Sequence, residues 1–341
     1  MNPVNSDGSL AAKKVQTFCD TSNYLYKILI GKIKEKYPLP ERLIIVPDDM
    51  LNNLAFDALL IRISGQGNDI PLQVNDDNFL VSHHAISYCF SANLLKEMCK
   101  TKKDNKLRLS LALFAPSFHA ESISLPFLNN QKVEIEEIHK IIPNSTIDLK
   151  STKERFISGA NKFAYLHIST HGYVSSDPDQ SYLAFSQHSA KTDTSQLFFL
   201  KELYNYQMDQ ELITMTACET ALGQQREGEG NISLARGFAY AGVRSFVTTL
   251  WKIPTNGATK IVPTFYNFLF NSHQTKDVAL ANSKRSFLKT GKNIYPENWA
   301  GLILIGNTKS VIITNSSHLL AWIVSGSLII VFLFWIRIFR K

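Results

Sequence analysis

A histidine and a cysteine stand 47 residues apart, each at the end of a similar segment. One segment runs from Tyr165 to Gly172 (YLHISTHG), and the other runs from Leu212 to Glu219 (LITMTACE). Each begins with an apolar run typical of a β-strand and reaches a reactive side chain, His171 or Cys218, before turn-prone sequence. If the two strands are neighbours in a parallel sheet, both side chains lie at the same carboxyl edge. An imidazole beside a thiol is the minimal machinery of a cysteine peptidase.

Each of these side chains also has a purely structural interpretation. Alone, Cys218 would fit a core cysteine at a strand end, and His171 would fit a hydrogen-bonded core histidine. The same structural interpretation suits His167, within the first strand, and also His83 and His84, near the start of another expected strand. It is therefore the pairing of a histidine with a cysteine that carries the chemical hypothesis.

A cysteine peptidase also needs groups that stabilise the oxyanion and orient the imidazole. The backbone N–H groups of Gly172 and Cys218 would form an oxyanion hole if the two loops face each other. Glu202, Asp177 and Glu219 are alternative orienting residues, and the sequence does not decide among them.

The expected scaffold alternates strands with helices. Strands are expected in the two segments above and at 42–46, 80–88, 106–115, 147–151, 243–251 and 298–306, with a hairpin-like stretch at 182–185. Helices are expected at 10–36, 91–100, 131–142, 152–162, 199–204, 233–241, 255–270 and 276–290. This alternation predicts an α/β fold, a three-layer sandwich in which a mostly parallel central sheet is flanked by helices.

Composition narrows the function classes. The net charge of +7 is scattered over 341 residues, which favours a solvated surface over direct binding of nucleic acid. The four cysteines fit neither a disulfide framework nor a zinc site, so we expect reduced thiols and no metal. The glycine-rich loop 223–230 lacks the Gly-Lys-Ser/Thr ending of a phosphate-binding loop, and we expect it to form a wall or lid of the substrate cleft.

The C-terminal residues 319–336 are 18 residues without a charge. As a helix they would be about 27 Å long, close to the thickness of a bilayer core. Trp322 and Trp335 lie near the two ends, and the basic tail 337–341 follows directly. The alternative is a buried C-terminal helix, but such a helix is rarely apolar on every face. We therefore predict a single transmembrane helix.

Two signals conflict on the orientation of this span. A basic tail prefers the cytoplasm, yet the domain before the span shows no export signal. We expect a single-pass protein of the inner (cytoplasmic) membrane, with a cytosolic peptidase domain and a tail inserted after synthesis. The predicted organisation is a polar segment 1–14, a domain 15–307, a linker 308–318, the span 319–336 and the tail 337–341.

Taken together, the motifs resemble those of the CHAT domain, a caspase-like peptidase domain often attached to tetratricopeptide repeats. The resemblance covers about residues 20–307. It rests first on His171-Gly172 and on Ala217-Cys218-Glu219-Thr220, with the histidine roughly 50 residues upstream of the cysteine as in caspases. The further matches are Leu43-Ile-Ile-Val-Pro-Asp-Asp49, Leu54-Ala-Phe-Asp-Ala-Leu59, His84-Ala-Ile-Ser-Tyr88, Ala235-Arg-Gly-Phe-Ala-Tyr-Ala-Gly242, Val247-Thr-Thr-Leu-Trp251, Phe265-Tyr266 and Trp299-Ala-Gly301.

The resemblance implies a caspase-like fold and a dyad of His171 and Cys218, with neither metal nor cofactor. Two positions depart from the family pattern: Asp49 replaces a glycine, and Ala55 replaces a proline before Phe56. Both are far from the dyad in sequence, so they bear on loop geometry rather than on chemistry. The tetratricopeptide repeats usual in the family are not found, and we expect either a separate sensor or regulator protein or a trimmed module.

For partners, the resemblance implies a protein substrate cut after a trigger, in bacterial defence or programmed cell death. With the membrane span, it points to a substrate that acts at the membrane, such as a gasdermin-like pore former. Two alternatives remain at this stage: a catalytically silent interaction module, and a membrane scaffold for a signalling complex.

Overall fold

The computed structural model of the chain describes residues 8–63, 76–100, 109–119, 121, 125, 128, 131–173, 175, 177–189, 191–216, 230–291 and 294–311. Within these ranges, no helix combines the length and the hydropathy needed to cross a membrane. The span expected at 319–336 lies outside the described residues, as does Cys218, so the span and the position of the thiol remain predictions.

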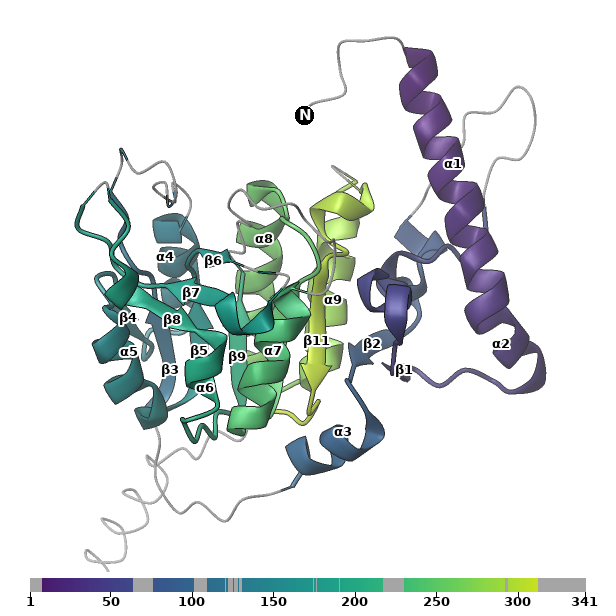
Figure 1. Cartoon of the computed structure of the whole chain (residues 1–341). Helices are drawn as coiled ribbons and strands as arrows, with labels where there is room; N and C mark the ends of the chain where they lie inside the picture. The colour runs from purple at the N-terminus through teal and green to yellow at the C-terminus, as the bar shows by residue number, and fades with distance from the viewer. Residues whose placement is uncertain are drawn as a thin grey trace, which may run out of the picture. The chain divides into compact units, whose positions relative to one another are not determined.

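An eight-stranded sheet forms the middle of the fold (Figure 1). Six of its seven neighbouring strand pairs are parallel, and the pair β10–β11 is antiparallel. The strands, in their order across the sheet, are β1 (Arg42–Ile45), β2 (Ala85–Tyr88), β11 (Leu302–Gly306), β10 (Ser245–Thr249), β9 (Leu212–Met215), β5 (Phe163–Ile168), β3 (Leu109–Phe114) and β4 (Thr146–Asp148). The α/β fold with a mostly parallel sheet is confirmed.

Two apolar cores lie on opposite faces of this sheet, because successive side chains of a strand point to opposite faces. In β3, Leu111 and Leu113 belong to one core, while Ala112 and Phe114 belong to the other. Helices α4 (Gln131–Ile141), α8 (Thr255–Tyr266) and α9 (Lys276–Leu288) supply the first core, and α5 (Lys153–Gly159), α6 (Leu200–Leu203) and α7 (Gly230–Ala241) supply the second (Figure 1). The predicted three layers are therefore present.

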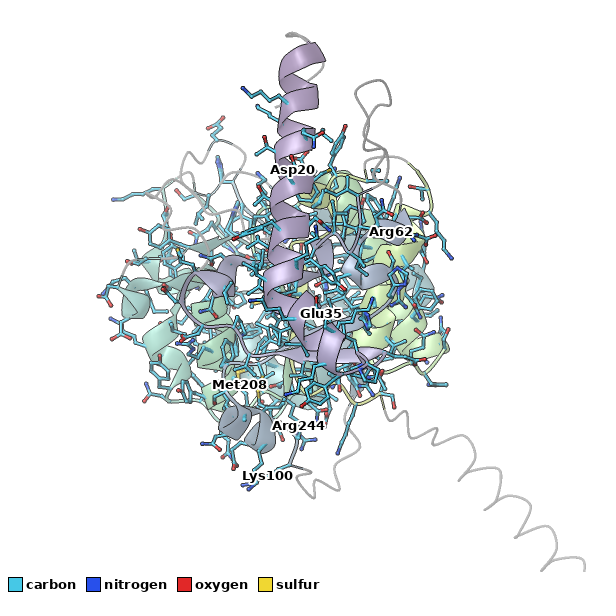
Figure 2. The ribbon with its side chains drawn as sticks, turned by 90° about the vertical axis from the view of Figure 1, so that its right-hand side faces the viewer. Asp20, Glu35, Arg62, Lys100, Met208 and Arg244 are labelled. Atoms are coloured by element: carbon cyan, nitrogen blue, oxygen red, sulfur yellow. The ribbon has the colours of Figure 1, made fainter. Side chains whose placement is uncertain are left out.

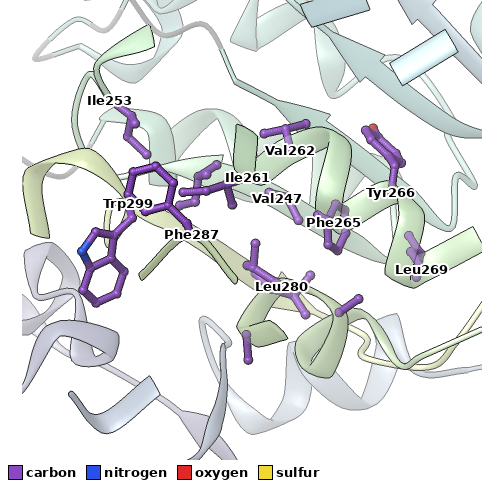
Figure 3. Close-up of a cluster of buried hydrophobic side chains, with 14 of the residues drawn as sticks. Val247, Ile253, Ile261, Val262, Phe265, Tyr266, Leu269, Leu280, Phe287 and Trp299 are labelled. Carbon is purple, nitrogen blue, oxygen red and sulfur yellow. The ribbon is translucent and has the colours of Figure 1, made fainter. Parts of the chain in front are cut away.

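The first core joins distant parts of the chain (Figure 3). The indole of Trp299 is fully buried and packs edge-on against Phe79, with ring centroids 5.0 Å apart. Its Nε1–H donates to the carbonyl of Ile294 over 2.9 Å, so the polar group of the indole is satisfied inside the core.

The N-terminal helix is continuous but contains a π-helical turn. It consists of α1 (Gly8–Tyr26), the π-turn Lys27–Gly31 and α2 (Lys32–Lys36), which matches the helix expected at 10–36. Buried Ser22 bonds both the carbonyl of Ala58 and the N–H of Leu60, each over 2.9 Å. These bonds fix α1 against the 3₁₀ turns that follow β1. The remaining helix, α3 (Ala92–Met98), is capped by Ser91, whose hydroxyl accepts from the N–H of Leu94.

The motif Leu54–Leu59 positions a buried ion pair. Asp57 lies in a 3₁₀ turn, and its carboxylate accepts from Lys284 Nζ over 2.6 Å and from the Tyr88 hydroxyl over 3.2 Å. The Tyr88 hydroxyl in turn accepts from the backbone N–H of Phe56 over 2.9 Å. Lys284 and Asp57 are 0% and 4% exposed at the side chain, so α9 is tied to this motif by charges that water does not screen.

One expected strand needs correction, and one departure from the family pattern affects the local backbone. The strand expected at 80–88 begins only at Ala85, because Leu80–Ser82 forms a 3₁₀ turn closed by bonds from His83 and His84 N–H to the Leu80 carbonyl. The departure at Asp49 has a conformational cost, since its φ of 48° lies in the left-handed region that glycine adopts freely. Aspartate is among the side chains that tolerate this region best.

Candidate active site

The strands that precede His171 and Cys218 are direct neighbours. β5 and β9 pair in parallel, and every paired residue of β9 is numbered 47 higher than its partner in β5, ending at Ile168↔Met215. His171 follows Ile168 by three residues, and Cys218 follows Met215 by three residues. The separation of the two reactive side chains along the sequence therefore equals the register offset of the strands that lead to them.

A small second sheet fixes the backbone at His171. It consists of β6 (Gly172–Tyr173), β7 (Tyr182–Ala184) and β8 (Leu197–Phe199), all antiparallel, and only the stretch at β7 was expected from the sequence. The carbonyl of His171 accepts from Ala184 N–H over 2.9 Å, and Gly172 lies opposite Leu183. In an antiparallel ladder this makes Gly172 a non-hydrogen-bonded position, so its N–H points away from β7.

The imidazole of His171 is buried at 1% exposure. Its ring packs edge-on against Phe118, with centroids 4.6 Å apart. The preceding Thr170 donates its hydroxyl to the carbonyl of Ala184. The side chain and the backbone of His171 are thus held from several directions, as a group used for proton transfer requires.

A buried polar cluster lies beneath this edge of the sheet. Glu134 of α4 accepts from Ser169 Oγ over 3.3 Å. His167 Nε2 lies 3.8 Å from Glu134 Oε1, and His167 Nδ1 lies 3.3 Å from the hydroxyl of Tyr266 in α8. Ser169 precedes His171 by two residues, so this carboxyl group contacts the strand end that leads to His171.

Burial sets the protonation states in this cluster. It raises the pKa of the Glu134 carboxyl to about 7, against the opposing hydrogen bond from Ser169. It lowers the pKa of the His167 imidazole to about 3. The Glu134–His167 distance is that of an ion pair, yet desolvation disfavours both charges. We therefore describe the contact as one between groups that are both neutral between about pH 3 and pH 7. The structural interpretation of His167 is confirmed.

Replacing Glu134 by glutamine is expected to change the pH dependence of stability. Between about pH 4.5 and 7 the native protein binds more protons at Glu134 than the unfolded chain does, so its free energy of unfolding falls as pH rises. The glutamine variant lacks this loss. The difference between its free energy of unfolding and that of wild type should therefore rise by on the order of 2–3 kcal/mol from pH 5 to pH 8, in favour of the variant. The opposite slope from His167 is present in both proteins and cancels in the comparison.

Urea unfolding of both proteins at the two pH values measures this difference. Glu136→Gln is the matched control, since Glu136 lies exposed on the same helix and should give the same difference from wild type at both pH values. A pH-independent difference between Glu134→Gln and wild type would show that Glu134 is ionised throughout.

The structure places two of the candidate orienting residues elsewhere. Glu202 forms an ion pair with Lys153 over 2.7 Å and accepts from the N–H of Phe199 at the start of α6. Asp177 accepts from the N–H of Asp179 within its own turn. The third candidate, Glu219, and most of the expected lid loop lie outside the described residues.

Two further histidines also need correction. The core position expected for His83 and His84 is wrong, because His83 is exposed and His84 is only half-buried. Their rings bond the backbone carbonyls of Asp77 and Pro40 over 2.8 and 2.7 Å.

The other thiols are chemically quieter. Burial raises the pKa of the Cys19 thiol to about 11, with a further contribution from Asp20. Burial also raises the pKa of the Cys89 thiol, and Cys99 is half-buried. A thiol that stays protonated is a poor nucleophile. Among the described residues, no group of three or more histidine, cysteine or acidic side chains is arranged to hold a metal ion.

The fold and this site define an α/β protein whose mostly parallel sheet presents a fixed histidine at one edge. The CHAT domain family matches residues 20–307, and the chain therefore belongs to that family. The wider expectation of a caspase-like peptidase is consistent with this membership.

Known proteins with similar sequences are much longer. Tetratricopeptide repeat protein 28 of Mus musculus is 26% identical over 106 residues, which are 31% of this chain and 4% of that protein. The protein of the same name from Homo sapiens is 30% identical over 79 residues, 23% of this chain and 3% of the relative. The matched parts thus span only a few per cent of these relatives.

Two solved structures are similar in part. The Arg specific cysteine proteinase gingipain R has a TM-score of 0.48 and 12% identity, covering 92% of this chain and 70% of that one. The separase in the Saccharomyces cerevisiae separase–securin complex has a TM-score of 0.42 and 12% identity, covering 67% of this chain and 14% of that one.

Proposed function

We propose that this protein is a cysteine endopeptidase in which His171 and Cys218 form the catalytic dyad. The observation that carries the proposal is the register of β5 and β9, whose offset of 47 residues is also the offset between the two reactive side chains. If the chain continues in the same way for three residues beyond each strand, the imidazole and the thiol come to neighbouring positions at the same edge.

The chemistry follows from these groups. The imidazole of His171 accepts the Cys218 thiol proton, and the thiolate attacks the carbonyl carbon of the scissile peptide bond. The N–H of Gly172 points away from β7 and, with the N–H of Cys218, donates to the oxyanion that forms. His171 then protonates the leaving amine, and water hydrolyses the thioester to release the second product and restore the thiol.

Membrane anchoring is the second part of the proposal. The uncharged sequence at 319–336, with its flanking tryptophans, supports a single span, and we place the peptidase domain on the cytosolic side although the basic tail alone favours the reverse. Protease treatment of sealed inner-membrane vesicles tests the orientation. The vesicles are prepared in two forms, one with the cytosolic face outside and one with the periplasmic face outside. A domain digested only when the periplasmic face is exposed contradicts it.

The family membership and the anchor together support a protein substrate that acts at the membrane. Among such substrates we propose a gasdermin-like pore former. It is cut in bacterial defence or programmed cell death, after a separate sensor protein responds. Co-expression with the product of a neighbouring gene should yield a discrete fragment that Cys218→Ala abolishes, and an intact partner contradicts this assignment.

An electrophilic peptide is the direct test of the dyad. A peptidyl acyloxymethyl ketone should label Cys218 in preference to Cys19, Cys89 and Cys99, because burial keeps the first two of these protonated. Mass spectrometry of the labelled chain identifies the modified thiol. Labelling that is equal across the four cysteines would favour an interaction module without turnover.

A further inference from the structure

A recess of about 560 Å³ lies beside the N-terminal helix, apart from the dyad. Its charged lining is mostly basic: Lys34 of α2, Arg62, and the two histidines His83 and His84 contribute to it. Asp77 is the one carboxylate among the described lining residues. The volume is in the range of small-molecule and side-chain binding sites. Figure 2 views the face of the molecule that carries α1, α2 and Arg62.

The two imidazoles in this recess are fixed in orientation. His83 Nε2 bonds the carbonyl of Asp77 over 2.8 Å, and His84 Nδ1 bonds the carbonyl of Pro40 over 2.7 Å. A carbonyl oxygen only accepts, so each of these nitrogens carries a proton. The other nitrogen of each ring becomes a second donor when the ring is protonated, which is the state that an anion would favour.

The charged groups that shift the pKa of His84 are all basic. Burial lowers the pKa of His84, the bond to Pro40 opposes that, and His83, Lys34 and Arg285 lower it further. Asp77 and Arg62 are the other charged groups that line the recess. An anion placed among these groups would offset the repulsion and bring a proton onto His84. Binding should therefore be tighter at about pH 6 than at about pH 8.

The recess lies at the same edge of the sheet as the dyad. β10 runs parallel to β9, β11 runs antiparallel to β10, and β2 and β1 run parallel to β11. The amino ends of β1 and β2 therefore lie at the edge where β5 and β9 have their carboxyl ends. His83 and His84 directly precede β2, which places the recess at this edge.

The distance between the two sites corresponds to a short peptide. β2 is three strands from β9 and four from β5, or about 14–19 Å at the usual spacing of strands. An extended peptide covers that distance in about four to six residues. Leu39 and Ile61 also line the recess and are suited to contact the methylene groups of a long acidic side chain.

We propose that this basic recess binds an acidic side chain of the peptide substrate, about four to six residues away from the bond cut at Cys218. The assignment to a substrate rests on the proposed peptidase function, whereas binding of the acidic peptide does not. The recess is thus a specificity site that selects acidic segments.

Binding is measured first without catalysis. The full chain carrying Cys218→Ala is titrated with a fluorescein-labelled peptide containing a run of glutamates, and with the same peptide carrying glutamines. Fluorescence anisotropy should show binding of the glutamate peptide that is roughly tenfold tighter at pH 6, with a smaller preference at pH 8. Arg62→Gln combined with Lys34→Gln should remove the preference.

Lys162→Gln is the matched control. Lys162 is an exposed lysine just before β5, at the opposite edge of the sheet, and its loss should leave the glutamate preference unchanged. Equal binding of the two peptides overturns the proposal, as does a preference that survives loss of both Arg62 and Lys34. Inorganic phosphate that binds while the glutamate peptide has no advantage identifies a phosphate site instead, and also overturns it.

Position relative to the cut bond is measured with the active protein. Wild type and Arg62→Gln digest a peptide library derived from a whole proteome, and the products are sequenced by mass spectrometry. Acidic residues should be enriched four to six positions from the cut in wild type and not in Arg62→Gln. Products without this enrichment overturn the substrate assignment. If neither protein cuts any peptide, it is the proposed function that fails, while the anisotropy result still decides whether the recess binds acidic peptides.

Discussion

His171→Ala is expected to lower kcat/KM for peptide cleavage by roughly 10³-fold or more, because the thiol loses its proton acceptor and the leaving amine loses its proton donor. The imidazole is buried and packed against Phe118, so this loss should not be restored by a neighbouring side chain. The measurement is cleavage of a fluorogenic peptide selected from the library digestion, at matched concentrations of folded protein.

A second measurement separates chemistry from misfolding. The rate of Cys218 alkylation is followed against pH in wild type and in His171→Ala. Without the imidazole, the pH midpoint of the alkylation rate should move to about 8.5, the ordinary pKa of a thiol. His188→Ala, at an exposed position, is the control and should keep full activity. Activity of His171→Ala within tenfold of wild type, with an unshifted alkylation profile, would reject the dyad.

Lys284→Met should cost about 3–5 kcal/mol of unfolding free energy, because it leaves the buried Asp57 carboxylate without its cation. The Tyr88 hydroxyl remains as a donor to Asp57, but one neutral hydrogen bond does not replace an ion pair at 2.6 Å. Urea unfolding monitored by circular dichroism gives the value, and the m-value shows whether both proteins unfold over the same surface.

The double variant Asp57→Leu with Lys284→Met distinguishes the cause. It removes both charges, and most of the lost stability should return, since apolar replacement of a buried pair is often close to neutral. Lys289→Met, an exposed position just after α9, should change stability by less than about 0.5 kcal/mol. A double variant as unstable as Lys284→Met alone would mean that packing, rather than charge, holds this site.

The strands that lead to the dyad can be predicted from the sequence, because a short apolar run indicates a buried strand without reference to distant residues. The run Leu212–Met215, for example, has three apolar residues of four and is buried throughout, which is typical of a strand buried on both faces of a parallel sheet. The register of β5 and β9 was not predictable in the same way, because it depends on helices that dock from elsewhere in the chain. The sequence alone suggested pairing the two reactive residues. The observed register adds that the strands leading to them are direct neighbours.

The buried cluster and the recess show where local reasoning stops. Glu134 lies in an amphipathic helix, next to buried Ile135 and one turn before buried Ile138, at the border of the apolar stripe. Only the docking of α4 over β5 decides that its carboxyl group enters the core. The strand expected at 80–88 includes His83 and His84, but the 3₁₀ turn at Leu80–Ser82 delays its start to Ala85 and leaves His83 exposed and His84 half-buried.

The order of strands in the main sheet has a consequence for the life of the protein before it becomes active. β2 pairs with β1 on one side and with β11 on the other, and β11 ends at Gly306. Synthesis proceeds from the N-terminus, so the first two strands and their recess stay undocked until almost the whole domain has been made. Because contacts that are so distant in sequence form late and slowly, the N-terminal strands should join the rest of the sheet among the last steps of folding. The position of the recess relative to the sheet edge at His171 is therefore fixed only when the domain is nearly complete.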